Sequence, residues 1–289
     1  MKIEWPTVCL MILTYVVWGF ALWVVAPWSI AMAVVLCALA ITQHSSLQHE
    51  VLHGHPFGNA RLNEASVWPA LGLVIPYQRF RDTHLAHHKD ANLTDPYDDP
   101  ETNFFDPAIW DKIPTYWQRV LRFNNTLAGR MLIGPAIGTF TFIRYDLCRF
   151  HDEVRRGWLA HIPAALTVLI FVWVSPMPIW SYLIACYLGL SILKIRTFLE
   201  HRAHDSHCGR TVVIDDQGPL ALLFLNNNYH IVHHMNPTVP WYKLPGLYRE
   251  KAQRFLEVND GYHYTSYRQI FARYFLKAKD PVPHPLWRK

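Results

Sequence analysis

The sequence predicts an all-α integral membrane protein with four transmembrane helices in two hairpins and a cytoplasmic helical cap that holds a two-metal site. Three observations lead to this fold class. Apolar residues make up 51% of the 289 residues and gather in long blocks. Lys and Arg lie almost entirely outside these blocks, and histidines cluster directly beyond them. We expect residues 1–289 to form a single domain of this kind.

The predicted spans cover residues 7–25, 28–48, 158–175 and 178–199, and each is long enough to cross a bilayer. A very short break, Ala26-Pro27, separates the first two blocks, and "SPMP" separates the last two. Such short connections predict antiparallel neighbours. The first block has no small-residue cleavage site and a second block follows at once, so we do not expect a cleaved signal peptide.

The distribution of Lys and Arg predicts the orientation. Twelve of them lie in residues 49–157 and thirteen from Arg196 to the end, whereas the two short connections contain none. By the positive-inside rule, both large polar regions face the cytoplasm. We therefore expect a cap formed from 49–157 and 200–289, with both termini and the active site cytoplasmic, and a location in a bacterial inner membrane.

The remaining composition excludes several classes. The net charge of +5 is mild, and no basic patch is interleaved with aromatic residues, so we expect no nucleic-acid partner. The five cysteines form no CxxC pair or regular framework, which argues against a disulfide scaffold and suits a reducing compartment.

Two further segments have apolar patterns that do not predict a span. Leu127–Ile143 is interrupted by glycines and a proline, so we expect it to be interfacial or re-entrant. Near the end, Tyr267, Ile270, Phe271, Tyr274 and Phe275 recur at helical spacing among Arg and Lys. This amphipathic helix suits either a membrane surface or packing against the cytoplasmic cap.

Most of the seventeen histidines are clustered. "HEVLH" spaces two of them at i and i+4, which share one face of a helix. In "HLAHH" and "HIVHH", the first histidine shares a face with both others, so one helix can offer imidazoles to two adjacent ions. "FLEHRAH" adds His201 and His204 at the end of the fourth span. The predicted topology brings all four elements to one membrane face, and nine imidazoles exceed the needs of one tetrahedral zinc.

The clusters, the paired spans and the context "NNNYHIVHHMNPTVPW" resemble the membrane-bound fatty acid desaturase superfamily, which includes hydroxylases, ketolases and alkane monooxygenases. The resemblance runs from about Leu36 to Pro245 and implies a non-haem di-iron centre with O₂ as co-substrate. "LEH" resembles the element that supplies a lone histidine in some members, whereas an Asn-x-x-x-His alignment would choose His204 instead of His201. The ligands implied are His49, His53, His84, His87, His88, His201, His230, His233 and His234.

The resemblance also implies the reaction and its partners. We expect an O₂-dependent desaturase acting on an acyl lipid or related aliphatic substrate. The alternative is a hydroxylase or monooxygenase acting on a lipid or a small aliphatic, amino-acid-like substrate. The chain has no cytochrome b5-like segment and no flavin or nicotinamide fingerprint, so electrons are expected from a separate ferredoxin, rubredoxin or cytochrome with its reductase.

Polar residues beside the clusters have two interpretations each. Asn226, Asn227 and Asn228 precede the third cluster. One of them could hold a metal-bound water or a ligand's second nitrogen, or they could cap a helix. An acidic stretch follows the second cluster, and we expect it to be a solvated loop rather than a set of carboxylates that orient imidazoles. It contains Asp90, Asp95, Asp98, Asp99 and Glu101. Isolated histidines are expected to be structural: His44, His151, His161, His207, His263 and His284.

Two distant alternatives use fewer of these residues. "HEVLH" matches the HExxH pattern of zinc metalloproteases, with Glu50 as the general base. A metal transporter would place ionisable ligands inside the spans. The protease pattern leaves both HxxHH clusters unexplained. The predicted spans are nearly free of the ionisable groups that a transporter needs, because the histidines gather at the ends of the spans.

Overall fold

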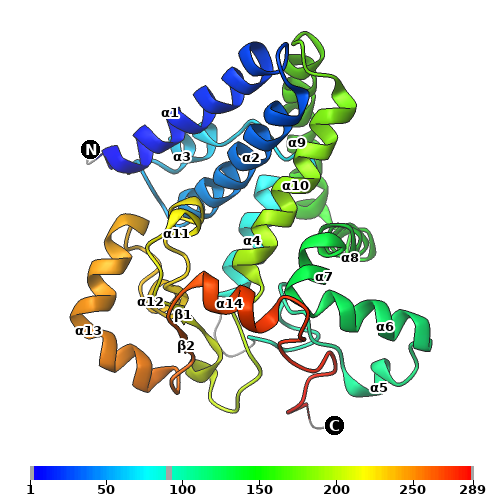
Figure 1. The fold of residues 1–289 in the computed structure, drawn as a ribbon, viewed down its shortest axis with the longest axis vertical. Coiled ribbons are helices and arrows are strands. Elements are labelled where there is room, and N and C mark those ends of the chain that lie inside the picture. Colours follow the sequence, from blue (N-terminus) through cyan, green and yellow to red (C-terminus); the bar gives the residue numbers. More distant parts are fainter. Residues whose placement is uncertain (1–2, 89–92, 288–289) are drawn as a thin grey trace. The chain divides into compact units, whose positions relative to one another are not determined.

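The computed structural model describes residues 3–88 and 93–287, and these are mostly helical (Figure 1). They form two compact units, each built from separate stretches of the chain. The first unit comprises 3–81, 135–193 and 223–225. The second comprises 82–88, 93–134, 194–222 and 226–287.

The first unit contains four helices that are long and apolar enough to cross a membrane. They coincide with the four predicted spans. Three shorter helical segments accompany them. The elements are α1 (Trp5–Phe20) with the π-helical turn η1 (Ala21–Val25), α2 (Ile30–Leu52), α3 (Ala60–Ser66), the start of α4 (Tyr77–His87), α8 (Gly134–Cys148), α9 (Asp152–Trp173) and most of α10 (Ile179–Thr197).

The ends of the spans differ from the prediction for local reasons. α9 begins at Asp152 rather than 158, because Asp152 and Glu153 favour the positive end of the helix dipole. α2 begins after Ser29, whose side chain accepts a hydrogen bond from the Met32 amide. It then continues to Leu52 and ends before Gly54, whose φ of 101° suits glycine. His49 is therefore helical.

The core of the first unit joins α1, α2, α9 and α10. Trp18 donates from its indole nitrogen to the Tyr182 hydroxyl (3.0 Å), and Tyr182 donates to the Leu71 carbonyl (2.7 Å). Gly189 lets α10 approach α2 closely, because a Cβ there would lie 3.1 Å from the Ala38 carbonyl oxygen. Thr42 donates to the Gly189 carbonyl across this contact. Small residues at close helix contacts are typical of membrane proteins.

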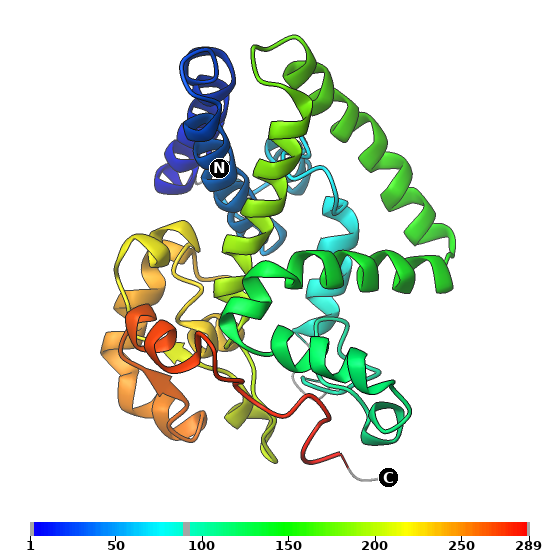
Figure 2. The same cartoon turned by 45° about the vertical axis from the view of Figure 1, so that its right-hand side comes forward.

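The outer surface of α1 is apolar. Ile12, Val16 and Phe20 are each exposed by half or more of their surface. In both views, α1 and α2 run side by side, and α9 and α10 share a turn from which they diverge (Figure 2). An apolar exterior on a long helix is the property expected of a lipid-facing span.

The second unit is built from short elements. It also contains a parallel pair of two-residue strands, which the all-α prediction missed: Val213 pairs with His263 and Ile214 with Tyr264. The elements are the end of α4, α5 (Pro107–Trp110), α6 (Thr115–Asn124), α7 (Leu127–Leu132), the 3₁₀ turn η3 (His207–Arg210), β1 (Val213–Ile214), α11 (Pro219–Leu223), α12 (His230–Met235), the 3₁₀ turn η4 (Trp241–Lys243), α13 (Leu244–Val258), β2 (His263–Tyr264) and α14 (Tyr267–Tyr274).

The two ambiguous segments have defined structures. The stretch 127–143 is divided between α7 and α8, which meet at Ile133 and Gly134. α14 buries Tyr267, Ile270 and Tyr274 within the protein, and the Tyr274 hydroxyl lies 2.7 Å from that of Tyr264. This side of the C-terminal helix therefore packs against the protein itself.

A buried ion pair ties α4 to α8 in the first unit. Arg79 donates from two nitrogens to the Asp146 carboxylate at 2.9 and 3.0 Å, and both side chains are buried. The Trp158 indole donates to the same carboxylate at 2.8 Å. A buried charge that loses its partner is strongly destabilising, whereas an exposed pair contributes little.

We predict that Asp146→Asn lowers the free energy of unfolding by about 3 to 5 kcal/mol, because the Arg79 charge stays buried without its counter-ion. The matched control is Asp152→Asn, which breaks an exposed pair with Arg155 and should have little effect. Unfolding of the detergent-solubilised protein by SDS, followed by circular dichroism, measures both. Equal losses of unfolding free energy in the two variants would contradict the structural role proposed for the buried Arg79–Asp146 pair.

Candidate metal centre

Two short helices of the second unit carry most of the clustered histidines. α4 ends with His84 and His87, and the His88 amide continues the helical pattern by donating to the His84 carbonyl at 3.0 Å. α12 is only six residues long and contains "HIVHH". The helical spacing predicted for both HxxHH clusters is confirmed.

One four-histidine group forms entirely within the second unit. Its members can each offer a ring nitrogen such that all four nitrogens lie within 4.8 Å of one another. His201 Nε2 lies 2.8 Å from His87 Nε2 and 3.1 Å from His230 Nε2. Two nitrogens each about 2.1 Å from one ion, at a right angle, would be about 3.0 Å apart. The observed distances are thus those of ligands around one ion. The group consists of His87, His201, His230 and His234.

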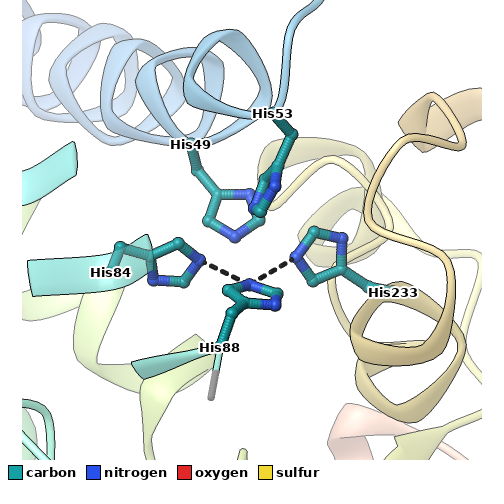
Figure 3. A group of neighbouring side chains, drawn as sticks. All are labelled: His49, His53, His84, His88 and His233. Atoms are coloured by element: carbon teal, nitrogen blue, oxygen red, sulfur yellow. Dashed lines mark hydrogen bonds between the residues drawn. The ribbon is translucent and has the colours of Figure 1, made fainter. Parts of the chain in front are cut away.

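A second group gathers beside it. His88 Nε2 lies 3.0 Å from His84 Nε2 and 3.2 Å from His233 Nε2, as the dashed lines in Figure 3 show. The His88 ring stacks on that of His234, with centroids 4.2 Å apart. The two groups are therefore adjacent, and α12 supplies side chains to both. This is the arrangement that the HxxHH spacing predicts for neighbouring metal ions.

His49 and His53 belong to the first unit. They project from the last turn of α2 and its end, with ring centroids 5.1 Å apart, and Figure 3 draws both. His49 is buried and His53 partly so. The predicted common face of this pair is confirmed.

Two carboxylates of the acidic loop contact the α4 histidines. Asp99 Oδ1 lies 2.8 Å from His87 Nδ1, and Glu101 Oε1 lies 3.0 Å from His84 Nδ1. In each ring the contact uses the nitrogen opposite the one facing the other histidines, which fixes the orientation and tautomer. The expectation of a solvated loop is wrong for these two residues. Of the others, Asp95 caps a turn, Asp98 is exposed, and Asp90 lies outside the described residues.

The asparagines before α12 divide their roles. Asn227 Oδ1 lies 3.3 Å from His230 Nδ1, and its amide donates to Glu200 at 2.8 Å. Asn227 thus holds a ligand candidate's second nitrogen, which is one of the two expectations. Asn228 instead donates to the Ile214 and Asp216 carbonyls. Asn226 has a left-handed φ of 52°, which asparagine tolerates better than most residues.

The electrostatic environment favours a bound cation. Burial lowers the pKa of His201 and of His230 well below the usual value, which keeps these imidazoles neutral, the form that binds metals. Burial also lowers the pKa of His87, but Glu101, Asp99 and Glu200 outweigh it and raise that pKa to about 9. Although burial opposes it, His84 and His87 hold the pKa of Glu101 well below its usual range. The fixed carboxylates therefore favour positive charge, as a proton on His87 or as a bound cation, beside the neutral His201 and His230.

The structure distinguishes His201 from His204. His201 lies in the four-histidine group, whereas His204 has other partners, with Nε2 3.2 Å from Asp260 and Nδ1 3.1 Å from the Ser206 carbonyl. Several histidines expected to be structural have polar partners: His44 contacts the Tyr15 hydroxyl, His161 donates to the Leu73 carbonyl, and His284 contacts Thr94.

Glu50 does not follow the pattern expected of a zinc protease. It is buried, and its carboxylate lies within 4.8 Å of ligand atoms of Glu4 and His55. His55 Nδ1 lies 2.9 Å from the Glu4 carboxylate. Glu50 thus belongs to a polar group with Glu4 and His55. HExxH chemistry uses only His49, Glu50 and His53, and it leaves the seven histidines of the second unit unexplained.

Sequence reasoning missed two supports of His201. Its Nδ1 lies 3.3 Å from the Thr211 hydroxyl, and its carbonyl accepts a hydrogen bond from the Lys279 ammonium group. In the sequence, Lys279 belongs with the basic residues that flank the C-terminal helix. Thr211 and Lys279 both lie outside the histidine clusters, so the residue spacing within the clusters does not indicate these contacts.

Comparisons with known proteins show the family of the chain. Residues 21–266 match the model of the fatty acid desaturase family. The chain is 26% identical to beta-carotene ketolases from two Paracoccus strains, over 72% of this chain and 72% of each relative. It is also 26% identical to the sphingolipid delta(4)-desaturase DES1 of Gallus gallus, over 72% of this chain and 61% of that protein. This chain is therefore an oxidoreductase that belongs to the fatty acid desaturase family.

Proposed function

We propose that the chain is a membrane di-iron enzyme that uses O₂ to oxidise a C–H bond of an apolar, membrane-held substrate. The observation that supports it most strongly is the pair of adjacent histidine groups in the second unit, with nitrogen spacings of 2.8 to 3.2 Å. Nitrogen ligands at this spacing suit iron or zinc, and family membership favours iron.

The proposed ligands of one ion are His87, His201, His230 and His234. We assign His84, His88 and His233 to the other, and propose that His49 and His53 complete its shell. Their shared face at the end of α2 and the family's ligand pattern support that assignment. Both termini and this site are proposed to face the cytoplasm of a bacterial inner membrane, with the spans arranged as two hairpins.

When bound, the two irons would supply the O₂ activation that attack on an unactivated C–H bond requires. The protein's own groups provide orientation. Asp99 and Glu101 hold His87 and His84, and Asn227 holds His230. Because these contacts use the Nδ1 atoms, each ring presents its Nε2 toward the centre of its group. The reaction also needs two electrons, for which we propose an external ferredoxin, rubredoxin or cytochrome.

Desaturation of an acyl lipid or related aliphatic substrate is our prediction for the outcome. Oxygen insertion is the second candidate, because two of the similar proteins are beta-carotene ketolases. Both outcomes begin with removal of one hydrogen. They differ in the second step, which either removes another hydrogen or returns oxygen to carbon, and substrate position decides between these steps.

The test supplies the reconstituted enzyme with a reducing system, membrane lipid extract and ¹⁸O₂, followed by mass spectrometry. A product that has lost two hydrogens and carries no ¹⁸O identifies a desaturase. One ¹⁸O in the product identifies oxygen insertion. Products that form equally without O₂ would contradict the proposal.

We predict that His201→Ala reduces iron from two to one per chain, whereas His204→Ala keeps both, because only His201 lies in the four-histidine group. Inductively coupled plasma mass spectrometry of the anaerobically loaded protein measures the stoichiometry. Iron loss on replacing His204 alone would reverse the assignment.

We also predict that Asp99→Asn weakens metal binding by roughly 10- to 100-fold, the usual effect of removing a group that orients a ligand. Competition between the apoprotein and a fluorescent chelator for Co(II) measures the affinity. Asp98→Asn is the matched control, since this neighbouring carboxylate is exposed. A similar loss in both variants would indicate a general effect of loop charge.

A further inference from the structure

Helix α6 in the second unit exposes aromatic side chains together with basic ones. Tyr116, Val120 and Phe123 follow one another at i, i+4 and i+7, so they share one face. Tyr116 is 61% exposed and Phe123 39%. Trp117, beside them, is 49% exposed and packs its ring on Tyr116 with centroids 5.3 Å apart. The aromatic face points outward.

The less exposed side of α6 carries both Gln118 and Leu121. Gln118 donates from its amide to the carbonyls of Trp110 and Ile113, both at 3.1 Å. At the end of the helix, Asn124 is buried. Lys112 before the helix and Arg119 within it are exposed basic residues, and Arg119 adjoins the aromatic face because it precedes Phe123 by four positions. In both views, α6 lies at the margin of the second unit (Figures 1 and 2).

We propose that this aromatic face of α6, with Lys112 and Arg119, rests on the surface of an anionic phospholipid bilayer. A helix with aromatic residues on one face and cations at its border is suited to the headgroup boundary. Trp and Tyr are enriched at that depth, where their rings are apolar and their edges polar. The four candidate spans bring a bilayer to this same chain. The sequence pattern alone points instead to α14, whose corresponding face is largely buried.

Contact of α6 with the bilayer would affect the loop that carries Asp99 and Glu101, the residues that orient His87 and His84. α7 presses on the end of α6, since a Cβ at Gly129 would lie 1.8 Å from the Phe123 carbonyl oxygen. The buried Arg130 of α7 donates to the Asn124 carbonyl at 3.0 Å and to the Asn103 side chain. Asn103 follows Glu101 by two residues, so a lipid-bound α6 is tied to the loop that orients His84.

The test is a depth measurement that needs neither iron nor turnover. The exposed cysteines Cys9, Cys148 and Cys208 are replaced by Ser, and a nitroxide is attached at Val120→Cys in the full chain. The protein is placed in vesicles of phosphatidylcholine and phosphatidylglycerol. Power-saturation EPR then compares the label's collisions with O₂ and with a water-soluble nickel chelate. Gln253→Cys, on an exposed position of α13, is the matched control.

We expect the O₂-to-nickel collision ratio to be roughly tenfold higher at position 120 than at 253, as for a label in the headgroup region. Tyr116→Cys, on the same face, repeats the measurement if the first variant folds poorly. A label at 120 that contacts the nickel chelate as freely as the one at 253 would overturn the proposal. Shielding from both reagents would also overturn it, since it would show that protein covers the face.

Discussion

The second unit depends on the crowding of seven histidines into one small volume. Their Nε2 atoms approach to 2.8 Å, 3.0 Å, 3.1 Å and 3.2 Å, a crowding of ring nitrogens that requires shared protons or a cation between them. The surrounding carboxylates reinforce this requirement, because they favour positive charge among the rings. Metal binding and the folding of this unit are therefore expected to be coupled.

The elements that meet this requirement are short and are held by contacts from distant segments. α12 is only six residues long, too short to be stable alone. Its own Val232 and the preceding Tyr229 form a small core with Leu244 and Tyr248, which fixes α12 against α13. On the other side, Asn227 and Glu200 join α12 to the chain beyond α10. Packing and polar contacts, rather than helical propensity, position the third histidine cluster.

Much of this arrangement could be predicted from the sequence. The four apolar blocks form four long helices, as predicted. This could be predicted because the length and hydropathy that a bilayer-spanning helix needs are local properties of the sequence. The i, i+3 and i+4 histidine spacings predicted shared faces, and the structure places the clusters of α4 and α12 together. The resemblance of the clusters identified the family. On "LEH" it favoured His201, which the structure places in the four-histidine group, and His201 as a metal ligand stays a prediction.

The features that could not be predicted depend on contacts between distant segments. Asp99 and Glu101 have the sequence context of a solvated loop, because nothing in "DPYDDPE" shows that the loop folds back to the histidines before it. Lys279 reaches the His201 carbonyl from 78 positions away in the sequence. The amphipathic pattern of α14 is visible in the sequence, yet only tertiary packing shows that its aromatic face turns inward. In α6 the polar side chain Gln118 turns inward, an orientation that composition does not reveal.

The pairing of two irons in adjacent histidine groups is tested most directly by Mössbauer spectroscopy. The purified protein is loaded anaerobically with ⁵⁷Fe(II), and spectra are recorded before and after exposure to O₂. We predict two irons per chain that become magnetically coupled on oxidation. A protein that retains one tightly bound zinc and no paired iron would contradict this prediction.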